Sequence, residues 1–391
     1  MSTRNQPAPL LLVLAFIAFI SLGLPDGLLG VAWPTLRQSF GVPLDALGQL
    51  MAVMISGYLL SSFTSGLLIA RIGLGWLLAA SCALTGGALL GYTVVPTWGL
   101  LLTLAVAAGL GAGAIDAGLN GYVAERFSDR TMQWLHASFG VGITLGPLIM
   151  TASLRQWETW RGGYIVVGIA QLLLALAFAT RLSVWQVDTS QRGEKIAPDA
   201  APWRGTLRQP RVWLSALLFF LYTGAELGLG LWLYTLLTDA RAVAPTVAGL
   251  VTGSYWAMFT VGRIIAGVAA TRIANQRLVN GGLLLATVGA LLLVRPGPPI
   301  AAVVAVALVG LAIAPIYPAL VSGTAQRVGA AFTTNSIGIQ VAAAGLGGAL
   351  LPGLLGLLAT RSTLNAIPVA LALLFVIMLA LHHVARHSPA R

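Results

Sequence analysis

The sequence predicts an all-α membrane protein in which twelve transmembrane helices form two six-helix bundles. Of its 391 residues, 58% are hydrophobic and only 8% are charged, whereas a soluble domain carries about 25% charged residues. Twelve apolar runs reach the length of about 20 residues that a helix needs to cross a bilayer. One long polar stretch separates the sixth run from the seventh, so the chain is expected to divide there.

The first six runs follow one another with short polar breaks, which favours neighbouring helices that run up and down. They cover approximately residues 10–37, 46–70, 73–95, 98–124, 132–154 and 162–185. The first run is too long for a signal peptide and has no small-residue cleavage site near its end, so we expect a retained span. Tryptophans at the span ends predict an interfacial belt, namely Trp98, Trp134, Trp157, Trp160, Trp185 and Trp213.

The second six runs complete the expected fold. They cover approximately residues 211–238, 247–270, 277–295, 299–325, 333–360 and 363–385. The polar stretch between the two sets contains the only lysine of the chain, Lys195. We therefore expect an N-terminal bundle at 1–185, a cytoplasmic linker at 186–210 and a C-terminal bundle at 211–391.

The distribution of basic residues predicts the orientation of the spans. With the N-terminus on the cytoplasmic side, fifteen lysines and arginines fall in cytoplasmic segments and six on the opposite side, while Arg263 lies inside a span. We therefore expect a multi-pass protein of the bacterial inner membrane, with the N- and C-termini in the cytoplasm.

Other functional classes find no support in the sequence. The net charge of +11 is scattered between apolar runs, so no basic face suited to nucleic acid forms. The single cysteine, Cys82, excludes an internal disulfide and a cysteine-based zinc site. Three histidines near the C-terminus have no acid beside them in the sequence and predict no metal site: His382, His383 and His387. Without a phosphate-binding loop or a catalytic spacing, we expect no enzyme activity, no catalytic residue and no bound cofactor.

An internal repeat relates the two halves. A shift of 200 residues superimposes Asp26 on Glu226 and Gly30 on Gly230, and a shift of 201 superimposes Arg71 on Arg272. Acids at matching places inside apolar runs are harder to attribute to chance than matching leucines or glycines. Two halves of six spans in the same orientation indicate a parallel repeat.

The segment 66-GLLIARIGLG-75 keeps the glycines and Arg71 of the signature between spans two and three of the major facilitator superfamily. The chain resembles that family over nearly its whole length. The resemblance implies a transporter with alternating access, in which Arg71 and Arg272 contribute to gating. Ala70 replaces the aspartate of the signature, which weakens the expected gating role of this loop.

Within that family, the chain is most similar to the branch of fucose permeases and sodium-glucose-transporter-like proteins. Four segments carry the similarity: the one around Asp26, 113-GAIDAGLNGYV-123, 135-LHASFGVGITLGPL-148 and 222-YTGAELGLGLW-232. Fucose permeases have an essential acid in span one and another in span four, four residues before an asparagine. Asp26, Asp116 and Asn120 match this pattern, so the resemblance implies proton coupling and sugar binding there.

Of eleven acids, only Asp26, Asp116 and Glu226 fall well inside apolar runs. A charge at mid-membrane costs at least about 2.5–3.5 kcal/mol, so such groups are expected to face a cavity or a partner. We interpret all three as proton-coupling candidates, with Asp26 and Glu226 also contacting substrate. The alternatives are structural carboxylates, above all an ion pair between Glu226 and Arg263, which lie in successive spans.

The remaining substrate-binding candidates are polar or aromatic. Asn120 follows Asp116 by one helical turn, so both project from one face and offer donors and acceptors to vicinal hydroxyls. Flat rings and amides would complete a sugar site, and helix packing is the alternative for each of them. The candidates are Trp33, His136, Tyr222, Trp232, Tyr255, Trp256, Tyr317, Asn335 and Gln340.

The sequence therefore predicts a secondary active transporter that takes up a monosaccharide or similar polyol by alternating access. The expected coupling ion is H⁺, with Na⁺ as the alternative. The second hypothesis is an exporter of amphipathic or cationic drugs or metabolites. The expected partners are a small-molecule substrate and the lipid bilayer, with the protein acting as a monomer.

Overall fold

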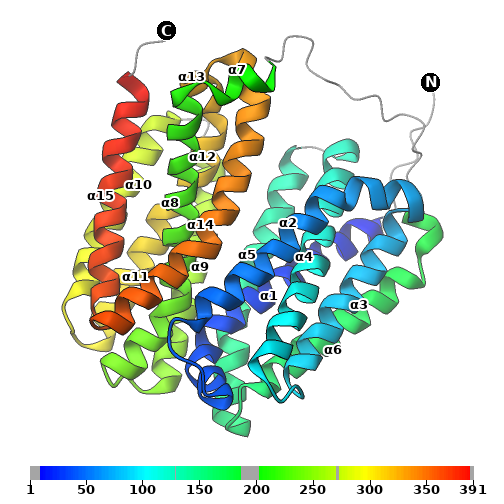
Figure 1. Ribbon diagram of the computed structural model, residues 1–391, viewed down its shortest axis with the longest axis horizontal. Coiled ribbons are helices and arrows are strands. Elements are labelled where there is room, and N and C mark those ends of the chain that lie inside the picture. Colours follow the sequence, from blue (N-terminus) through cyan, green and yellow to red (C-terminus); the bar gives the residue numbers. More distant parts are fainter. Residues whose placement is uncertain (1–8, 128, 186–201, 270–272, 388–391) are drawn as a thin grey trace. The chain divides into compact units, whose positions relative to one another are not determined.

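The computed structural model describes residues 9–127, 129–185, 202–269 and 273–387, and over these residues it consists of helices joined by short loops, with no strand (Figure 1). Eleven of the described helical segments are long and apolar enough to cross a membrane. Helices satisfy their backbone hydrogen bonds internally, which is what a chain surrounded by lipid requires.

The first six predicted spans are all helical. They are α1 Pro9–Phe40, α2 Ala46–Ile72, α3 Leu74–Tyr92, α4 Trp98–Arg126, α5 Asp129–Trp157 and α6 Arg161–Ala179. The predicted end of the sixth span at 185 is wrong. The α-helix stops at Ala179, and residues Leu182–Trp185 form a short 3₁₀ helix, η1.

The second set contains more short pieces. Two short helices, α7 Trp203–Leu207 and α13 Thr324–Val328, accompany the longer α8 Pro210–Thr235, α9 Pro245–Ala269, α10 Asn275–Val294, α11 Pro299–Ile313, α12 Ile316–Ser322, α14 Thr333–Arg361 and α15 Ala366–His387. A π-helical turn, η3 Leu236–Ala240, extends α8.

The predicted tenth span is broken in the middle. Helix α11 ends at Ile313 and α12 begins at Ile316, with Pro315 between them. Proline has no backbone N–H to donate and its ring obstructs the preceding turn, which explains the break. Together α11 and α12 supply one span, Ile300–Ser322.

Helix α9 corresponds to the eighth predicted span, 247–270, although it is not among the eleven apolar segments. It is 25 residues long, but it contains Arg263 and several hydroxyl and aromatic side chains, which lower its hydropathy. Such residues are tolerated in a spanning helix when they face protein rather than lipid. With α9, the described helices supply the twelve spans of the predicted all-α membrane fold.

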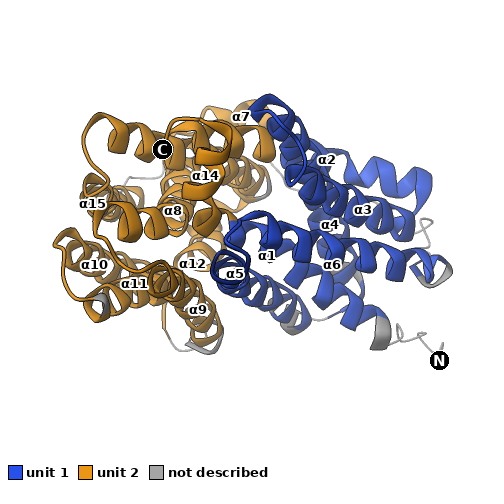
Figure 2. Cartoon of the chain, turned by 90° about the horizontal axis from the view of Figure 1, so that it is seen from below, with its two compact units in different colours: residues 1–28, 56–192 blue, residues 29–55, 193–391 orange. Residues whose placement is uncertain are grey.

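The chain divides into two compact units, one formed by residues 1–28 and 56–192 and the other by residues 29–55 and 193–391 (Figure 2). Segment 29–55, which the sequence analysis assigned to the N-terminal bundle, belongs to the second unit. This segment makes specific contacts there: Arg37 forms an ion pair with Asp239 at 3.6 Å, and Gly48 lies directly against Gly353.

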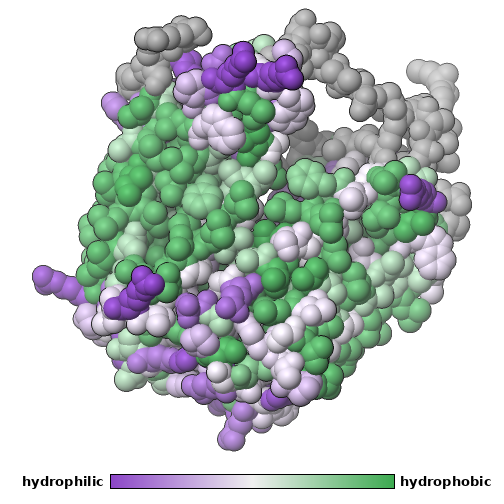
Figure 3. All heavy atoms as spheres, in the orientation of Figure 1, coloured by the Kyte–Doolittle hydropathy of each residue, from purple (hydrophilic) through white to green (hydrophobic). Residues whose placement is uncertain are grey.

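Large apolar side chains on the outside of the helices form the surface expected to meet lipid. Figure 3 shows hydrophobic residues covering the flank of the second unit where α10, α11 and α15 lie. Exposed examples in the two units include Phe63, Leu173, Ile300 and Leu373. In water such a surface would drive aggregation, whereas in a bilayer it is the stable arrangement.

The predicted tryptophan belt is only partly correct. Trp134, Trp157 and Trp213 are exposed, whereas Trp160 and Trp185 are buried. Trp185 lies in η1 and packs against Phe178, with ring centroids 5.3 Å apart. The 3₁₀ turn after α6 therefore folds back onto the core of the first unit, where an interfacial position was expected.

Candidate functional site

A hydrogen-bonded carboxylate lies in the first unit, between α2 and α4. The Tyr58 hydroxyl donates to Oδ2 of Asp116 at 2.6 Å, and Nδ2 of Asn120 donates to Oδ1 of the same carboxylate at 3.0 Å. Asp116 and Asn120 lie one turn apart on α4, as their spacing predicts. Each carboxylate oxygen thus has one recorded donor and retains a second acceptor position.

Close packing of α2 on α4 holds Tyr58 over the carboxylate. Gly113 lies directly against the backbone carbonyl of Tyr58, and the Ser62 hydroxyl donates to the Gly113 carbonyl at 3.2 Å. A side chain at 113 would have to displace backbone, so glycine permits the approach of the two helices. The sequence did not single out Tyr58 or Ser62, because hydroxyl groups in an apolar run give no signal of their own.

His136 lies on α5 of the same unit. It interacts electrostatically with Asp116, and its side chain remains exposed. The imidazole also stands edge-on to Phe19 of α1, with ring centroids 5.7 Å apart and an interplanar angle of 89°. The cluster therefore combines an acid, an amide, a phenol and an imidazole.

Asp26 lies on α1, which runs unbroken through Pro25. Its side chain is partly buried, and among the described residues it has neither a hydrogen bond nor an ion pair. On either side of it, Gly23 and Gly27 lie directly against the backbone of α5. The local packing therefore fixes the helix that carries Asp26 but leaves its carboxylate without a counter-charge.

Glu226, the repeat counterpart of Asp26 on α8, has a different environment in the second unit. Its carboxylate lies 3.9 Å from Nη2 of Arg263 on α9, and the Tyr255 hydroxyl donates to its backbone carbonyl at 2.9 Å. The Arg263 guanidinium also stacks over the Phe259 ring at 4.3 Å. The pair anticipated from successive spans is thus present in the geometry.

Most of the aromatic candidates are buried in the second unit. Trp33, Tyr222, Trp232, Tyr255 and Trp256 have almost no accessible surface. The Trp232 indole donates to the Pro352 carbonyl at 2.8 Å, and the Tyr222 hydroxyl donates to the Ile313 carbonyl at 3.1 Å. In this conformation they pack helices together and present no face to a ligand.

Tyr317 is the aromatic candidate that keeps partial exposure, and it stands edge-on to Phe219 with ring centroids 5.0 Å apart. Gln340 is buried in a polar cluster that the sequence did not reveal. Its Nε2 donates to Ser215 at 2.9 Å, and its Oε1 accepts from Thr324 at 3.1 Å. Nε of Arg327 donates to the same Ser215 hydroxyl at 3.2 Å.

The two gating candidates gain little support from their surroundings. Arg71 lies in the last turn of α2 with an exposed side chain, two residues before Gly73, which adopts a positive φ of 81°. Arg272 lies outside the described residues. An ion pair that the sequence did not predict, Arg37 with Asp239, joins α1 to η3 within the second unit.

The comparisons with known proteins agree with this architecture. Sodium-dependent glucose transporter 1A of Mus musculus is 23% identical over 381 residues, which cover 88% of this chain and 88% of that protein. The 4-hydroxybenzoate transporter PcaK of Pseudomonas putida is 26% identical over 183 residues, covering 46% of this chain and 40% of that protein.

A bacterial homologue of the human lysosomal transporter Spinster, in an inward-facing and occupied crystal structure, shares the fold. The TM-score is 0.80 at 14% identity, covering 99% of this chain and all of that one. The family model described as the Major Facilitator Superfamily matches residues 11–242. Twelve spans, a repeated pair of intramembrane acids and this match together establish that the chain belongs to the Major Facilitator Superfamily of membrane transporters.

Proposed function

We propose that this chain is a cation-coupled carrier that takes up a monosaccharide or similar polyol by alternating access, with H⁺ as the coupling ion. The observation that carries the proposal is the environment of Asp26. Its carboxylate lies in an apolar helix and has no ion pair or hydrogen bond among the described residues. Such a group is stable in the membrane only when a proton or a cation neutralises it.

The polar cluster around Asp116 is the proposed contact for substrate hydroxyls. Its carboxylate keeps acceptor positions beyond those used by Tyr58 and Asn120, and the Asn120 amide and the His136 imidazole supply further polar atoms. Vicinal hydroxyls both donate and accept, so they match a site of this mixed character. Asp116 also serves as the second proton-coupling group of the proposal.

Glu226 enters the proposal in a different role. Because Arg263 stands beside it, its carboxylate has a counter-charge within its own unit. We assign it to a structural or gating ion pair of the second unit. This assignment separates the two acids of the repeat, one as a proton carrier and one as part of a fixed pair.

The relatives support a carrier of small polar solutes and name two alternatives to be tested. The mouse relative is described as sodium-dependent and as a glucose transporter, which supports a sugar substrate and makes Na⁺ the competing coupling ion. PcaK is described as a 4-hydroxybenzoate transporter, so an aromatic acid belongs in the same panel. An exporter of cationic drugs would need the opposite direction of net flux.

The test is uptake into liposomes that contain the purified full-length chain. Labelled hexoses, polyols, 4-hydroxybenzoate and a cationic dye are each offered with an inward pH gradient, an inward Na⁺ gradient or neither. We expect a hexose or polyol to accumulate only with the pH gradient, and we expect Asp26→Asn to equilibrate that solute without accumulating it.

Glu158→Gln, which neutralises an exposed loop acid, is the matched control and should behave as wild type. Accumulation by Asp26→Asn at the wild-type level would show that Asp26 is not the coupling residue. Accumulation of the aromatic acid alone, or extrusion of the dye alone, would overturn the substrate assignment while leaving the family unchanged.

A further inference from the structure

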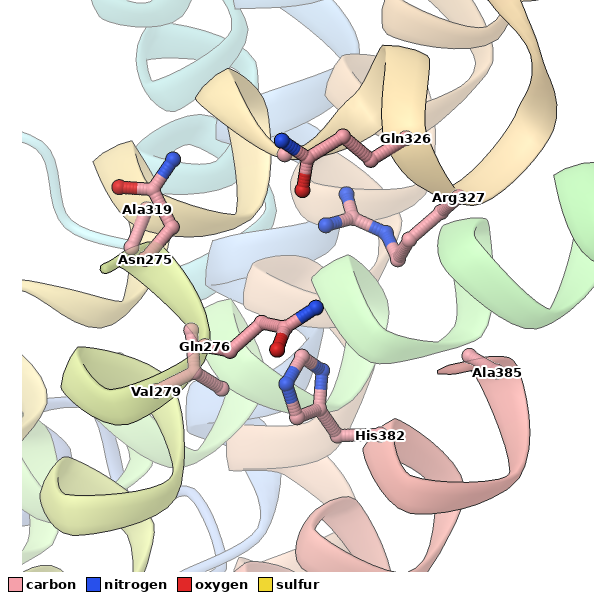
Figure 4. A pocket seen from close by; sticks show the side chains of 9 residues that line it. Asn275, Gln276, Val279, Ala319, Gln326, Arg327, His382 and Ala385 are labelled. Atoms are coloured by element: carbon pink, nitrogen blue, oxygen red, sulfur yellow. The ribbon is translucent and has the colours of Figure 1, made fainter. Parts of the chain in front are cut away.

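A polar pocket lies in the second unit, remote in sequence from the acids discussed above. It is a cavity of about 160 Å³ between the start of α10, the α12–α13 segment and the end of α15 (Figure 4). Arg327 and His382 form its buried floor, being 7% and 2% exposed. The amide side chains of Asn275, Gln276 and Gln326 line the rest of the polar wall.

Arg327 is fixed on one side of the guanidinium by neutral acceptors. Nε donates to the Ser215 hydroxyl at 3.2 Å, and Nη2 donates to the Leu320 carbonyl and to the Thr324 hydroxyl. Within the described parts of the chain, no carboxylate lies within 4.0 Å of this guanidinium. The protein therefore orients a buried cation without neutralising it.

The charge of this cation persists at neutral pH. Burial lowers the pKa of Arg327 to about 10, which still leaves the guanidinium protonated at pH 7. A buried charge without a partner is costly, so a bound anion would stabilise this part of the fold. Arg263 of the same unit, by contrast, has the carboxylate of Glu226 beside it.

The remaining donors of Arg327 face open space. Nη1 makes no hydrogen bond to the described residues, and it lies beside Gly323, where a Cβ would come within 2.8 Å of it. The absence of a side chain at 323 therefore leaves Nη1 accessible from the cavity. Figure 4 shows the amides of Gln276 and Gln326 directed toward the same space as the guanidinium.

We propose that this pocket binds a phosphoryl group, held by the Arg327 guanidinium and by the side-chain amides of Asn275, Gln276 and Gln326. A planar guanidinium matches phosphate oxygens through parallel hydrogen bonds, and primary amides add N–H donors. The cavity has room for several water-sized groups, given about 30 Å³ for each water molecule, so a tetrahedral oxyanion fits.

Two sources could supply this chemistry: free inorganic phosphate and the phosphodiester of an acidic lipid. Basic pockets between transmembrane helices are suited to acidic headgroups on the cytoplasmic side. Either ligand would tie α10, α13 and α15 together at one end of the second unit. The inference is independent of the transported substrate, because none of the proposed substrate contacts lines this pocket.

The experiment measures thermal unfolding of the purified full-length chain in two settings. In an uncharged detergent, sodium phosphate is compared with sodium chloride at equal ionic strength. In nanodiscs, phosphatidylcholine alone is compared with phosphatidylcholine containing phosphatidylglycerol. We expect the Tm to rise in at least one setting, because a ligand that binds only the folded state stabilises it. A rise in detergent identifies free phosphate, and a rise only in nanodiscs identifies the lipid.

Three variants assign the effect to the pocket. Arg327→Gln removes the cation, and Gln326→Glu places a carboxylate beside it while leaving the buried hydrogen bonds of Arg327 intact. Both should lose the anion-dependent rise in Tm, and Gln326→Glu should be more stable than wild type without added anion. Arg277→Gln removes an exposed charge from the same end of α10 without touching the pocket, and it should keep the rise.

The proposal is overturned if the wild-type Tm does not respond in either setting. It is equally overturned if the rise persists in Gln326→Glu, or if Arg277→Gln loses it to the same extent as the pocket variants, since binding would then follow general surface charge. If Arg327→Gln does not fold, Gln326→Glu decides the question alone.

Discussion

Asp26 and Glu226 occupy equivalent places in the two halves of the sequence, yet the structure gives them opposite surroundings. Glu226 lies beside Arg263 at 3.9 Å, whereas Asp26 has no counter-charge among the described residues of its unit. Both helices of the repeat carry an acid, and within the described parts of the chain only the acid of the second unit has a counter-charge beside it. The comparison teaches that equivalent positions of a repeat can differ in charge balance: one acid is paired within its own unit, and the other is not paired with any residue that the structure describes.

The packing of these two helices has been preserved more closely than their chemistry. In the first unit, Gly142 of α5 lies directly against the Ile20 carbonyl of α1. In the second, Gly347 of α14 lies directly against the Phe220 carbonyl of α8. Glycine at both positions lets backbones approach where any side chain would intrude. The two halves therefore share the contacts between these helices, whereas the surroundings of their acids differ.

The largest expected difference between the two acids is in transport. Asp26→Asn should abolish accumulation, which for one charge moving across 100 mV is worth about 2.3 kcal/mol, or about fifty-fold. Glu226→Gln should slow uptake but preserve the final accumulation ratio, because the coupling group remains. The measurement is the steady-state ratio of solute inside and outside liposomes. Equal ratios in the two variants would erase the proposed distinction.

The equivalent glycine contacts of the two units should respond in the same way to substitution. Gly142→Ala and Gly347→Ala should each lower the free energy of unfolding by about 1–3 kcal/mol, because the added methyl group collides with backbone. Gly121→Ala and Gly338→Ala, on α4 and α14, have open space at the same position and should be neutral or slightly stabilising. Chemical denaturation in detergent would check this. If only one of the two contact variants is destabilised, the equivalence of the two units is broken.

The ion pair of the second unit predicts a smaller, non-additive effect. Arg263→Gln should lower stability by about 1–2 kcal/mol, discounted for the partial exposure of Arg263, because Glu226 then remains buried without its partner. Adding Glu226→Gln should recover most of that loss. The control is Asp26→Asn, which removes an unbalanced charge and should not lower stability. A double variant less stable than Arg263→Gln would show that the pair is not the source of the effect.

The smallest predicted effect sharpens the role of the Asp116 cluster. Tyr58→Phe removes one donor to the carboxylate and should weaken substrate binding or stability by about 1 kcal/mol. Ser62→Ala removes a hydroxyl of the same helix that donates to backbone instead and serves as the matched control. Competition for uptake by unlabelled substrate would measure the difference. An identical response in both variants would mean that the bond from Tyr58 is structural only.

The fold was predictable from the sequence, because the length and the hydropathy of a span are properties of consecutive residues. The spacing of Asp116 and Asn120 was also predictable, since four residues make about one helical turn. The break at Pro315 within the tenth run was not predicted, although proline offered the signal. The 3₁₀ turn that buries Trp185 left no such signal.

The surroundings of individual side chains were harder to predict. Trp33 and Trp232 were candidates for ligand binding, yet both are packed in the interior. An aromatic ring in an apolar run suits helix packing as well as ligand binding, so the sequence does not distinguish the two roles. Arg327 was counted among the cytoplasmic residues because it falls between the predicted spans 299–325 and 333–360, yet it is buried. Which side of a helix meets protein depends on tertiary packing, and hydropathy alone does not carry that information.

The break between α11 and α12 has a mechanical consequence. The carbonyl of Ile313, at the end of α11, accepts the hydroxyl of Tyr222 from the middle of α8. Because Ile313 precedes Pro315, this hydrogen bond fixes the end of α11 to α8 and does not itself involve α12, beyond the break. The hydrogen bond therefore anchors the span formed by α11 and α12 to α8 on one side of its break only.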